Sequence, residues 1–177
     1  TNDVSATTDE DTAVTVNLDA TEIDGDNYSF SIVGQPSNGT LGSINGNHVV
    51  YSPNQDWNGT DAFTFEATDD RILLGKQNVA TATITVNPVN DAPVTINRTS
   101  STDEDVALNI TLTASDIEND NLSFSIASET SNGATVLSGA IVTYTPSSDW
   151  NGTDAFSFKA NDGTDDSNTS TVTITVN

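Results

Sequence analysis

The strongest constraint on this 177-residue chain is an internal repeat. Residues 56–63 recur without change at residues 149–156, 93 positions later. Residues 83–87 recur at 173–177, only 90 positions later, because the first copy carries a few additional residues around 71–77. The similarity extends from end to end, so we interpret the chain as two copies of one module. The predicted boundaries are 1–88 for the first module, 89–93 for a linker and 94–177 for the second module.

Each copy shows apolar and polar residues in alternation, with Asn, Asp, Gly and Pro between the runs, which is typical of short half-buried strands. Seven strands are predicted in the first copy, at residues 5–8, 13–18, 27–33, 41–44, 48–52, 62–67 and 80–86. Asn45 and Gly46 form the predicted turn of a tight hairpin. This pattern predicts an all-β fold of two tandem immunoglobulin- or cadherin-like Greek-key β-sandwiches. The predicted core of the first copy contains Val14, Val16, Leu18, Phe30, Ile32, Phe63, Phe65, Ile84 and Val86.

The charge of the chain excludes several functions. Four basic and 26 acidic residues give a formal net charge of −22. A nucleic-acid binder needs a cationic face, and so does a protein that docks on anionic lipid headgroups. The chain contains no apolar run of 18 residues, so we expect no membrane insertion. Because it contains no Cys, there is neither a disulfide framework nor a thiolate metal site.

Antiparallel connectivity predicts that oxygen-bearing side chains gather where the two copies join. The turns after the first and fifth strands of copy one, the linker, and two turns of copy two all face this junction. The predicted ligands there are Glu10, Asp61, Asn90, Asp91, Asp116, Glu118 and Asp162. Carboxylates at close range repel one another, and a hard divalent cation relieves this repulsion. Ca²⁺ prefers six to eight such oxygen ligands, whereas a typical zinc or copper site needs Cys or more than one His.

The same segments resemble the calcium motifs of cadherin repeats. The resemblance is carried by residues 113–118, by residues 159–163 and by the linker 89–93. Both copies are similar to the cadherin-like tandem modules of large secreted or cell-surface bacterial adhesins. That resemblance implies calcium-binding sandwiches in long arrays, with the junction residues named above as ligands. Cadherin linkers normally begin with an Asp, where this chain has Pro88, and they carry a second Asn that is missing here before Ala92. We therefore expect one or two ions at the junction.

The outer ends of the two modules carry further acidic residues that the same reasoning treats as half-sites. Their completing ligands would come from neighbouring modules, so we expect weaker calcium binding there. The predicted half-site residues are Glu22, Asp24 and Asp69 in the first copy and Glu104 and Asp154 in the second.

Two tryptophans admit two interpretations. Trp57 and Trp150 occupy equivalent places, each six residues after a tyrosine, Tyr51 or Tyr144. They either form a structural corner between two strands or display a platform on which a sugar stacks. Catalysis has little support, because the chain contains no nucleophile elbow, no P-loop and no His-Glu-x-x-His motif.

These observations lead to a functional hypothesis. We expect a non-enzymatic, monomeric, calcium-binding tandem module that rigidifies and extends a secreted or cell-surface bacterial adhesin. Its expected partners are neighbouring modules of the same chain, and polysaccharide or a cell surface is a further candidate partner. The alternative is a carbohydrate-binding β-sandwich that uses calcium or aromatic contacts. Direct homophilic adhesion is a third possibility, although the chain has no N-terminal Trp for strand exchange.

Overall fold

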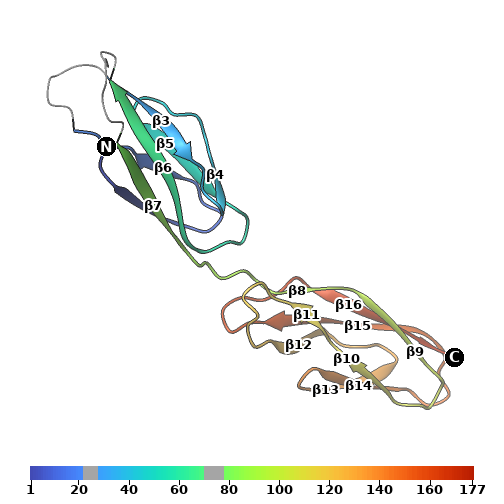
Figure 1. Cartoon of the computed structure of the whole chain (residues 1–177). Coiled ribbons are helices and arrows are strands. Elements are labelled where there is room, and N and C mark those ends of the chain that lie inside the picture. Colours follow the sequence, from blue (N-terminus) through green and yellow to red (C-terminus); the bar gives the residue numbers. More distant parts are fainter. Residues whose placement is uncertain (22–27, 70–77) are drawn as a thin grey trace. The chain divides into compact units, whose positions relative to one another are not determined.

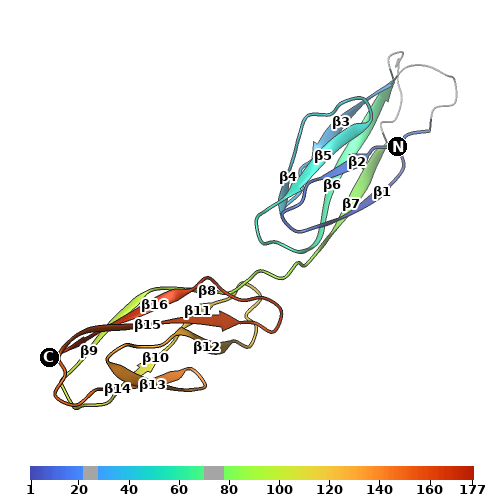
Figure 2. The same cartoon turned by 180° about the vertical axis from the view of Figure 1, so that it is seen from behind.

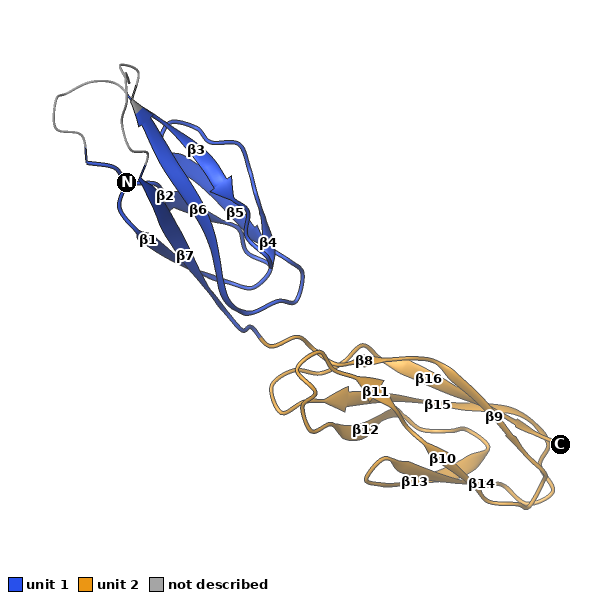
Figure 3. Ribbon diagram, in the orientation of Figure 1, with its two compact units in different colours: residues 1–89 blue, residues 90–177 orange. Residues whose placement is uncertain are grey.

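The computed structural model describes residues 1–21, 28–69 and 78–177, with only the backbone described at residue 69. The chain forms two compact units, Thr1–Val89 and Asn90–Asn177, which are called the first and second unit here (Figure 3). Each unit is described by itself. No helix in the described part of the chain is long and apolar enough to cross a membrane.

The described residues of the first unit form two sheets in two layers (Figure 1). The larger sheet has the order β1-β7-β6-β3 and the smaller one β2-β5-β4. The larger sheet contains β1 (Val4–Asp9), β7 (Val79–Asn87), β6 (Gly59–Asp69) and β3 (Tyr28–Gly34). The smaller sheet contains β2 (Val14–Asn17), β5 (His48–Pro53) and β4 (Gly39–Leu41). The first and last strands, β1 and β7, are parallel, whereas the other pairs are antiparallel.

The second unit, all of which is described, repeats this arrangement (Figure 2). Its larger sheet has the order β12-β15-β16-β9 and its smaller one β10-β14-β13, with an additional two-stranded ladder of β8 and β11. The larger sheet contains β12 (Ser123–Ser128), β15 (Gly152–Asn161), β16 (Ser170–Val176) and β9 (Arg98–Thr102). The remaining strands are β10 (Leu108–Thr111), β14 (Ile141–Pro146), β13 (Gly133–Ser138), β8 (Val94–Thr95) and β11 (Ala114–Ser115).

Alternation along the strands builds one core in each unit, because successive side chains point to opposite faces of a sheet. In β7 every second residue from Ala80 to Val86 is buried, and the residues between them are not. The predicted core residues Val16, Leu18, Phe63, Phe65, Ile84 and Val86 are buried, and Val14, Phe30 and Ile32 pack against them. The prediction of an all-β fold of two sandwiches is confirmed.

The hairpin between β4 and β5 turns one residue later than predicted. Asn45 and His48 exchange backbone hydrogen bonds, with N···O distances of 2.9 and 3.1 Å. The central residues of the turn are therefore Gly46 and Asn47, and Gly46 adopts a φ of 63°. The strand before the turn lies earlier than expected, at Gly39–Leu41. A side chain at residue 39 could not fit, since a Cβ there would lie 2.5 Å from the ring of Tyr51.

The tryptophans form structural corners. Trp57 and Trp150 are partly buried and pack against the cores of their units. Each indole covers a glycine two residues later, where a Cβ would lie 3.1 Å from the ring. These glycines, Gly59 and Gly152, adopt φ values of 135° and 138°, which disfavour any other residue. The structural interpretation of the tryptophans is confirmed, and the indoles contribute to packing.

Candidate metal centre

Three segments of the second unit meet at one end of its sandwich. The ladder pair Val94–Ser115 holds the end of the linker beside the turn that begins at Asp116. The pair Ser123–Asn161 places the end of that turn opposite the end of β15. The polar residues that these segments and the linker carry are called the acidic end of the second unit: Asn90, Asp91, Asp116, Glu118, Asp162 and Asp165.

Thr95 fixes the linker to the rest of the second unit. Its backbone N–H donates to Oδ1 of Asn168 at 2.9 Å, and its hydroxyl lies 2.9 Å from Oγ of Ser170. The side-chain amide of Asn168 returns a hydrogen bond to the carbonyl of Thr95 at 3.0 Å. Thr95 is only 3% exposed, so these hydrogen bonds are buried. They give the linker a fixed point only a few residues after Asn90.

Asn90 connects the linker to the turn after β15. Its amide nitrogen lies 3.0 Å from Oδ2 of Asp162 and 3.1 Å from Oδ2 of Asp165. The other oxygen of Asp162 accepts hydrogen bonds from the backbone N–H groups of Thr164 and Asp165. Hydrogen bonds from Asp165 and then Thr164 lower the pKa of Asp162, so this carboxylate remains ionised to a lower pH than usual.

The turn after β11 holds two carboxylates with unsatisfied oxygens. Oδ1 of Asp116 accepts a hydrogen bond from the backbone N–H of Asp120 at 2.9 Å. Oδ2 of Asp116 is buried and receives no hydrogen bond from the described residues. The same is true of Oε2 of Glu118 within the described part of the chain. A buried carboxylate oxygen without a donor or cation is costly, so both atoms are candidate metal ligands.

A third oxygen of this kind belongs to the first unit. The backbone N–H of Glu10 donates to the carbonyl of Asn87 at 2.9 Å, which fixes the residue beside the end of β7. Oε1 of Glu10 accepts a hydrogen bond from the backbone N–H of Val89. Glu10 is 4% exposed, and its Oε2 is buried with no donor among residues 1–21, 28–69 and 78–177. Val89 immediately precedes Asn90, so Glu10 is tied to the residue next to the linker Asn.

Asp61 forms a hydrogen-bonded corner with Tyr51 in the first unit. Its oxygens accept hydrogen bonds from the backbone N–H groups of Ser37, Asn38 and Ala62 and from the hydroxyl of Tyr51, at 2.8–3.0 Å. Burial tends to raise the pKa of Asp61, but these hydrogen bonds outweigh it and the pKa is lowered. Burial, followed by the hydrogen bond to Asp61, raises the pKa of Tyr51 well above its ordinary value. Because protein donors already satisfy both oxygens, we leave Asp61 out of the proposed ligand set.

Asp154 repeats this arrangement in the second unit. It accepts hydrogen bonds from the backbone of Ser131, Asn132 and Ala155 and from Tyr144. Its pKa is lowered because these hydrogen bonds outweigh the effect of burial. Burial and the hydrogen bond to Asp154 raise the pKa of Tyr144 to about 12. Asp154 thus has a structural role in its unit, and its half-site role stays a prediction. We call each pair the Tyr–Asp corner of its unit.

For the other predicted half-site residues, the structure shows no arrangement of side chains that could hold a metal ion among the residues it describes. Glu22 and Asp24 lie outside the described residues, and Asp69 is described only as part of the backbone of β6. Glu104 is exposed, although its N–H donates to the carbonyl of Asn177 just as that of Glu10 does to Asn87. Across the described residues, no three His, Cys, Asp or Glu side chains are grouped closely enough to form a ready-made metal cage.

The sequence interpretation missed one residue. Asp165 is not among the predicted ligands, yet its carboxylate accepts a hydrogen bond from the amide of Asn90. Its neighbour Asp166 does belong to the surface, where it pairs with Lys159 at 3.4 Å. A local signal existed, because Asp162 and Asp165 are three residues apart in a turn that contains Gly163.

The side chains of the acidic end offer carboxylate and amide oxygens as metal ligands, and these are the ligands that Ca²⁺ prefers.

Comparison with known proteins agrees with this fold. Among solved structures, the chain is similar to human protocadherin-24 EC1-2, with a TM-score of 0.65, 16% identity and coverage of 98% of this chain and 94% of that one. It is also similar to human mucin-like protocadherin EC1-2, with a TM-score of 0.54, 17% identity and coverage of 99% and 95%. Likeness at these identities shows the fold alone.

Some matching structures are much longer than this chain. The chain spans 27% of an endo-fucoidan hydrolase from glycoside hydrolase family 107, at 22% identity and a TM-score of 0.42. It spans 40% of the human desmocollin-1 ectodomain, at a TM-score of 0.49. No curated protein matches the chain.

Both copies match one sequence family. The family described as bacterial Ig domain matches residues 1–87 and again residues 90–175. Together with the cadherin-like fold, this confirms the resemblance to bacterial cadherin-like tandem modules that the repeated motifs suggested. The chain therefore belongs to the bacterial Ig domain family, of which it contains two copies in tandem.

Proposed function

We propose that this chain is a non-enzymatic, calcium-binding extender module of a bacterial extracellular adhesin. The observation that carries the proposal is the set of buried carboxylate oxygens that lack a donor within the described residues, on Glu10, Asp116 and Glu118. In a folded protein almost every buried polar atom has a partner. Three such exceptions in the turns that flank one linker favour a ligand that the chain itself does not supply.

The chemistry of these atoms favours calcium. Carboxylate oxygens and the side-chain oxygen of Asn90 are hard ligands, and the chain contains no Cys and one His. The acidic end also surrounds Asn90 with the negative charge of Asp162 and Asp165. When bound, Ca²⁺ would neutralise this charge and satisfy the unpaired oxygens. Asp116, Glu118 and Asp162 are the proposed ligands from the turns, Asn90 and Asp91 are those from the linker, and Glu10 is a further one.

The position of the proposed ligands in the linker suggests how calcium would stiffen the chain. Asn90 and Asp91 directly follow Val89, whose N–H already donates to Glu10. A cation bound by the linker residues would restrict the backbone torsions of this short segment. Calcium would then reduce motion along the chain, as expected for a module that extends an adhesin. Extracellular modules bind calcium with dissociation constants of about 10⁻⁴–10⁻³ M, which matches a protein that meets the ion only outside the cell.

Two features support a non-enzymatic role. The prominent turn carboxylates are either held by hydrogen bonds, as in the Tyr–Asp corners, or gathered at the ends of the sandwiches. Both copies also match the family described as bacterial Ig domain. The two tryptophans pack against the cores and do not favour the alternative of an aromatic sugar platform at those positions.

Calcium titration of the whole chain by isothermal calorimetry tests the proposal. We expect binding in the range of about 0.1–1 mM, and at least a tenfold loss of affinity at the tightest site in Asp116→Asn and Glu118→Gln. Glu104→Gln is the matched control, since Glu104 occupies the place of Glu10 in the second unit but is exposed. Small-angle scattering with calcium or EDTA then measures whether the ion narrows the distribution of solution shapes.

Two results would contradict the proposal. If Asp116→Asn and Glu118→Gln bind calcium as tightly as the parent chain, the buried oxygens are not ligands. If binding occurs but the scattering profile is the same in calcium and in EDTA, the chain binds the ion without acting as a calcium-rigidified extender.

A further inference from the structure

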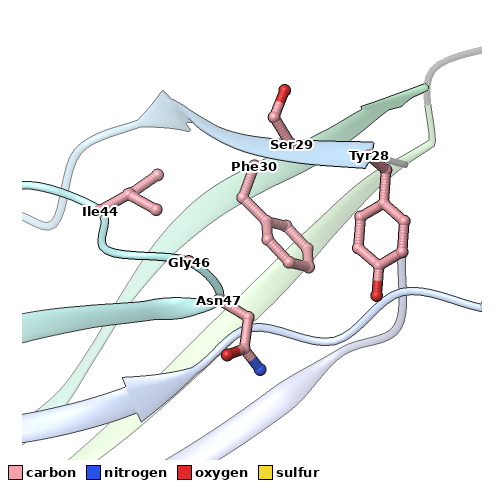
Figure 4. Close-up of a pocket in the computed structure, with 6 residues that line it drawn as sticks. All are labelled: Tyr28, Ser29, Phe30, Ile44, Gly46 and Asn47. Carbon is pink, nitrogen blue, oxygen red and sulfur yellow. The ribbon is translucent and has the colours of Figure 1, made fainter. Parts of the chain in front are cut away.

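The first unit carries a pocket away from the linker, between its two sheets. The pocket has a volume of about 600 Å³, within the range of small-molecule sites. Its walls are one end of β3 and the hairpin that leads into β5 (Figure 4). The lining residues are Tyr28, Ser29, Phe30, Ile44, Gly46 and Asn47.

An aromatic row supports one wall of the pocket. Tyr28 and Phe30 are two residues apart on β3 and therefore project from the same face of the strand. Their rings meet edge to face with centroids 5.5 Å apart, and Phe30 in turn contacts the core residue Phe65 at 5.9 Å. Tyr28 remains 40% exposed, so a ligand can reach its ring. The ring is thus anchored through Phe30 to the core while its outer part is open to solvent.

The polar groups of the pocket carry no charge. Beside the aromatic wall lie the hydroxyl of Tyr28, the amide of Asn47 and the backbone of Gly46 (Figure 4). The backbone of Asn47 is fixed because its carbonyl accepts a hydrogen bond from the N–H of Leu18 at 2.8 Å. Its side-chain amide donates a second hydrogen bond, of 3.3 Å, to the carbonyl of Leu18. In a chain with a net charge of −22, the described residues of the lining include no carboxylate, which favours an uncharged ligand.

The repeat shows that these polar groups are special to the first unit. Residues 29–32 recur at 123–126, so Leu122 stands in the place of Tyr28. The carbonyl of Ala140 accepts the N–H of Leu112 just as that of Asn47 accepts Leu18, so Ala140 is the counterpart of Asn47. The second unit has therefore the same hairpin without the hydroxyl or the amide. The sandwich fold requires neither group, which separates them from the residues that build the module.

We propose that this pocket binds a neutral glycan through one pyranose ring. The C–H face of the sugar would pack against the aromatic wall of Tyr28 and Phe30, and its hydroxyls would exchange hydrogen bonds with Tyr28 and Asn47. An aromatic surface beside a few convergent neutral polar groups is suited to such a ligand, which is apolar on its faces and polar at its rim. The calcium ligands named under the proposed function are not among the residues that line this pocket.

The test is a titration of the whole ¹⁵N-labelled chain, in EDTA, with cellotriose, maltotriose and lactose, followed by NMR chemical shifts. At least one sugar should shift the amide signals of Gly46 and Asn47 with a dissociation constant of about 1 mM. Asn47→Ala and Tyr28→Ala should each weaken that binding about tenfold or more, and Tyr28→Phe should weaken it less. Leu122→Ala, at the matching place in the second unit, should change nothing.

The proposal fails if none of the three sugars shifts these signals at about 20 mM, well above the expected dissociation constant. It also fails if a sugar binds but Asn47→Ala, a substitution at an exposed position, leaves the affinity unchanged. Because the titration is carried out without calcium, its failure leaves the calcium proposal untouched.

Discussion

The Tyr–Asp corners and the acidic turns around the linker both contain partly or fully buried carboxylates, but they hold them differently. In the corners, Asp61 and Asp154 each accept hydrogen bonds from three backbone N–H groups and one tyrosine. In the turns, Glu10, Asp116 and Glu118 each keep a buried oxygen without a donor in the described structure. The first arrangement is complete with protein atoms alone, whereas the second is not. Whether hydrogen bonds satisfy every carboxylate oxygen therefore separates the carboxylates that build the fold from those that we propose as calcium ligands.

The largest expected effect is the loss of a corner carboxylate. Asp61→Ala leaves three backbone N–H groups and one hydroxyl without their acceptor, so we expect the first unit to lose about 3 kcal/mol of unfolding free energy. Asp154→Ala should do the same to the second unit. Urea unfolding of the two variants measures the effect, with Asp166→Ala as an exposed control. Calcium affinity that fell while stability stayed constant would show that Asp61 is a ligand after all.

Acid should unfold the chain partly through the same corners. The pKa values of Asp61 and Asp154 are lowered in the folded state from the ordinary value of 3.8. Their contribution to stability is therefore fully present above about pH 5, where both states are ionised, and is lost as the pH falls through the folded-state pKa. Unfolding free energies measured in EDTA between pH 6 and pH 2 check this sign. In Asp61→Asn, which keeps an acceptor but no charge, the decline in this range should be shallower.

Calcium should have a smaller effect that depends on the other set of carboxylates. With a dissociation constant of about 1 mM, 10 mM calcium stabilises the folded state by about 1.4 kcal/mol. Thermal unfolding with calcium and with EDTA measures this difference. Glu10→Gln should reduce it, because the substitution removes a proposed ligand charge, whereas Glu104→Gln should not. Equal calcium stabilisation in all three chains would show that Glu10 does not take part.

The smallest effect should come from the corner tyrosine. Tyr51→Phe removes one of the hydrogen bonds to Asp61 and keeps the ring that packs against Gly39. We expect a loss of about 1 kcal/mol, since the three backbone donors to Asp61 remain. The same change at Tyr144 is the internal replicate. A loss as large as that of Asp61→Ala would mean that the hydroxyl, and not the backbone, organises the corner.

Much of the fold followed from the sequence, because alternation and turn residues are local signals. The core residues from Val16 to Val86 could be named from local alternation alone. The pairing of β1 with β7 joins segments at opposite ends of the module, and no local pattern predicts it. The roles of the acidic residues depended on more than topology. Asp61 finds its donors at Ser37 and Asn38, on a turn more than 20 residues away, and no local pattern reveals that contact. Sequence spacing could show which carboxylates share an end of a sandwich, but not which oxygens were already satisfied.

The parallel pairing of the first and last strands has a consequence for a chain under tension. In the first unit, Val4–Asp9 of β1 lie beside 82–87 of β7 in six successive pairs, and β9 and β16 repeat the arrangement in the second. The polypeptide thus enters a sandwich at one end and leaves it at the other. A pulling force along the strands loads the backbone hydrogen bonds between these paired strands in shear. The hydrogen bonds must therefore break together and cannot be broken one after another. Single-molecule stretching, with a proline placed in β1 as the weakened comparison, would measure how much load each sandwich withstands.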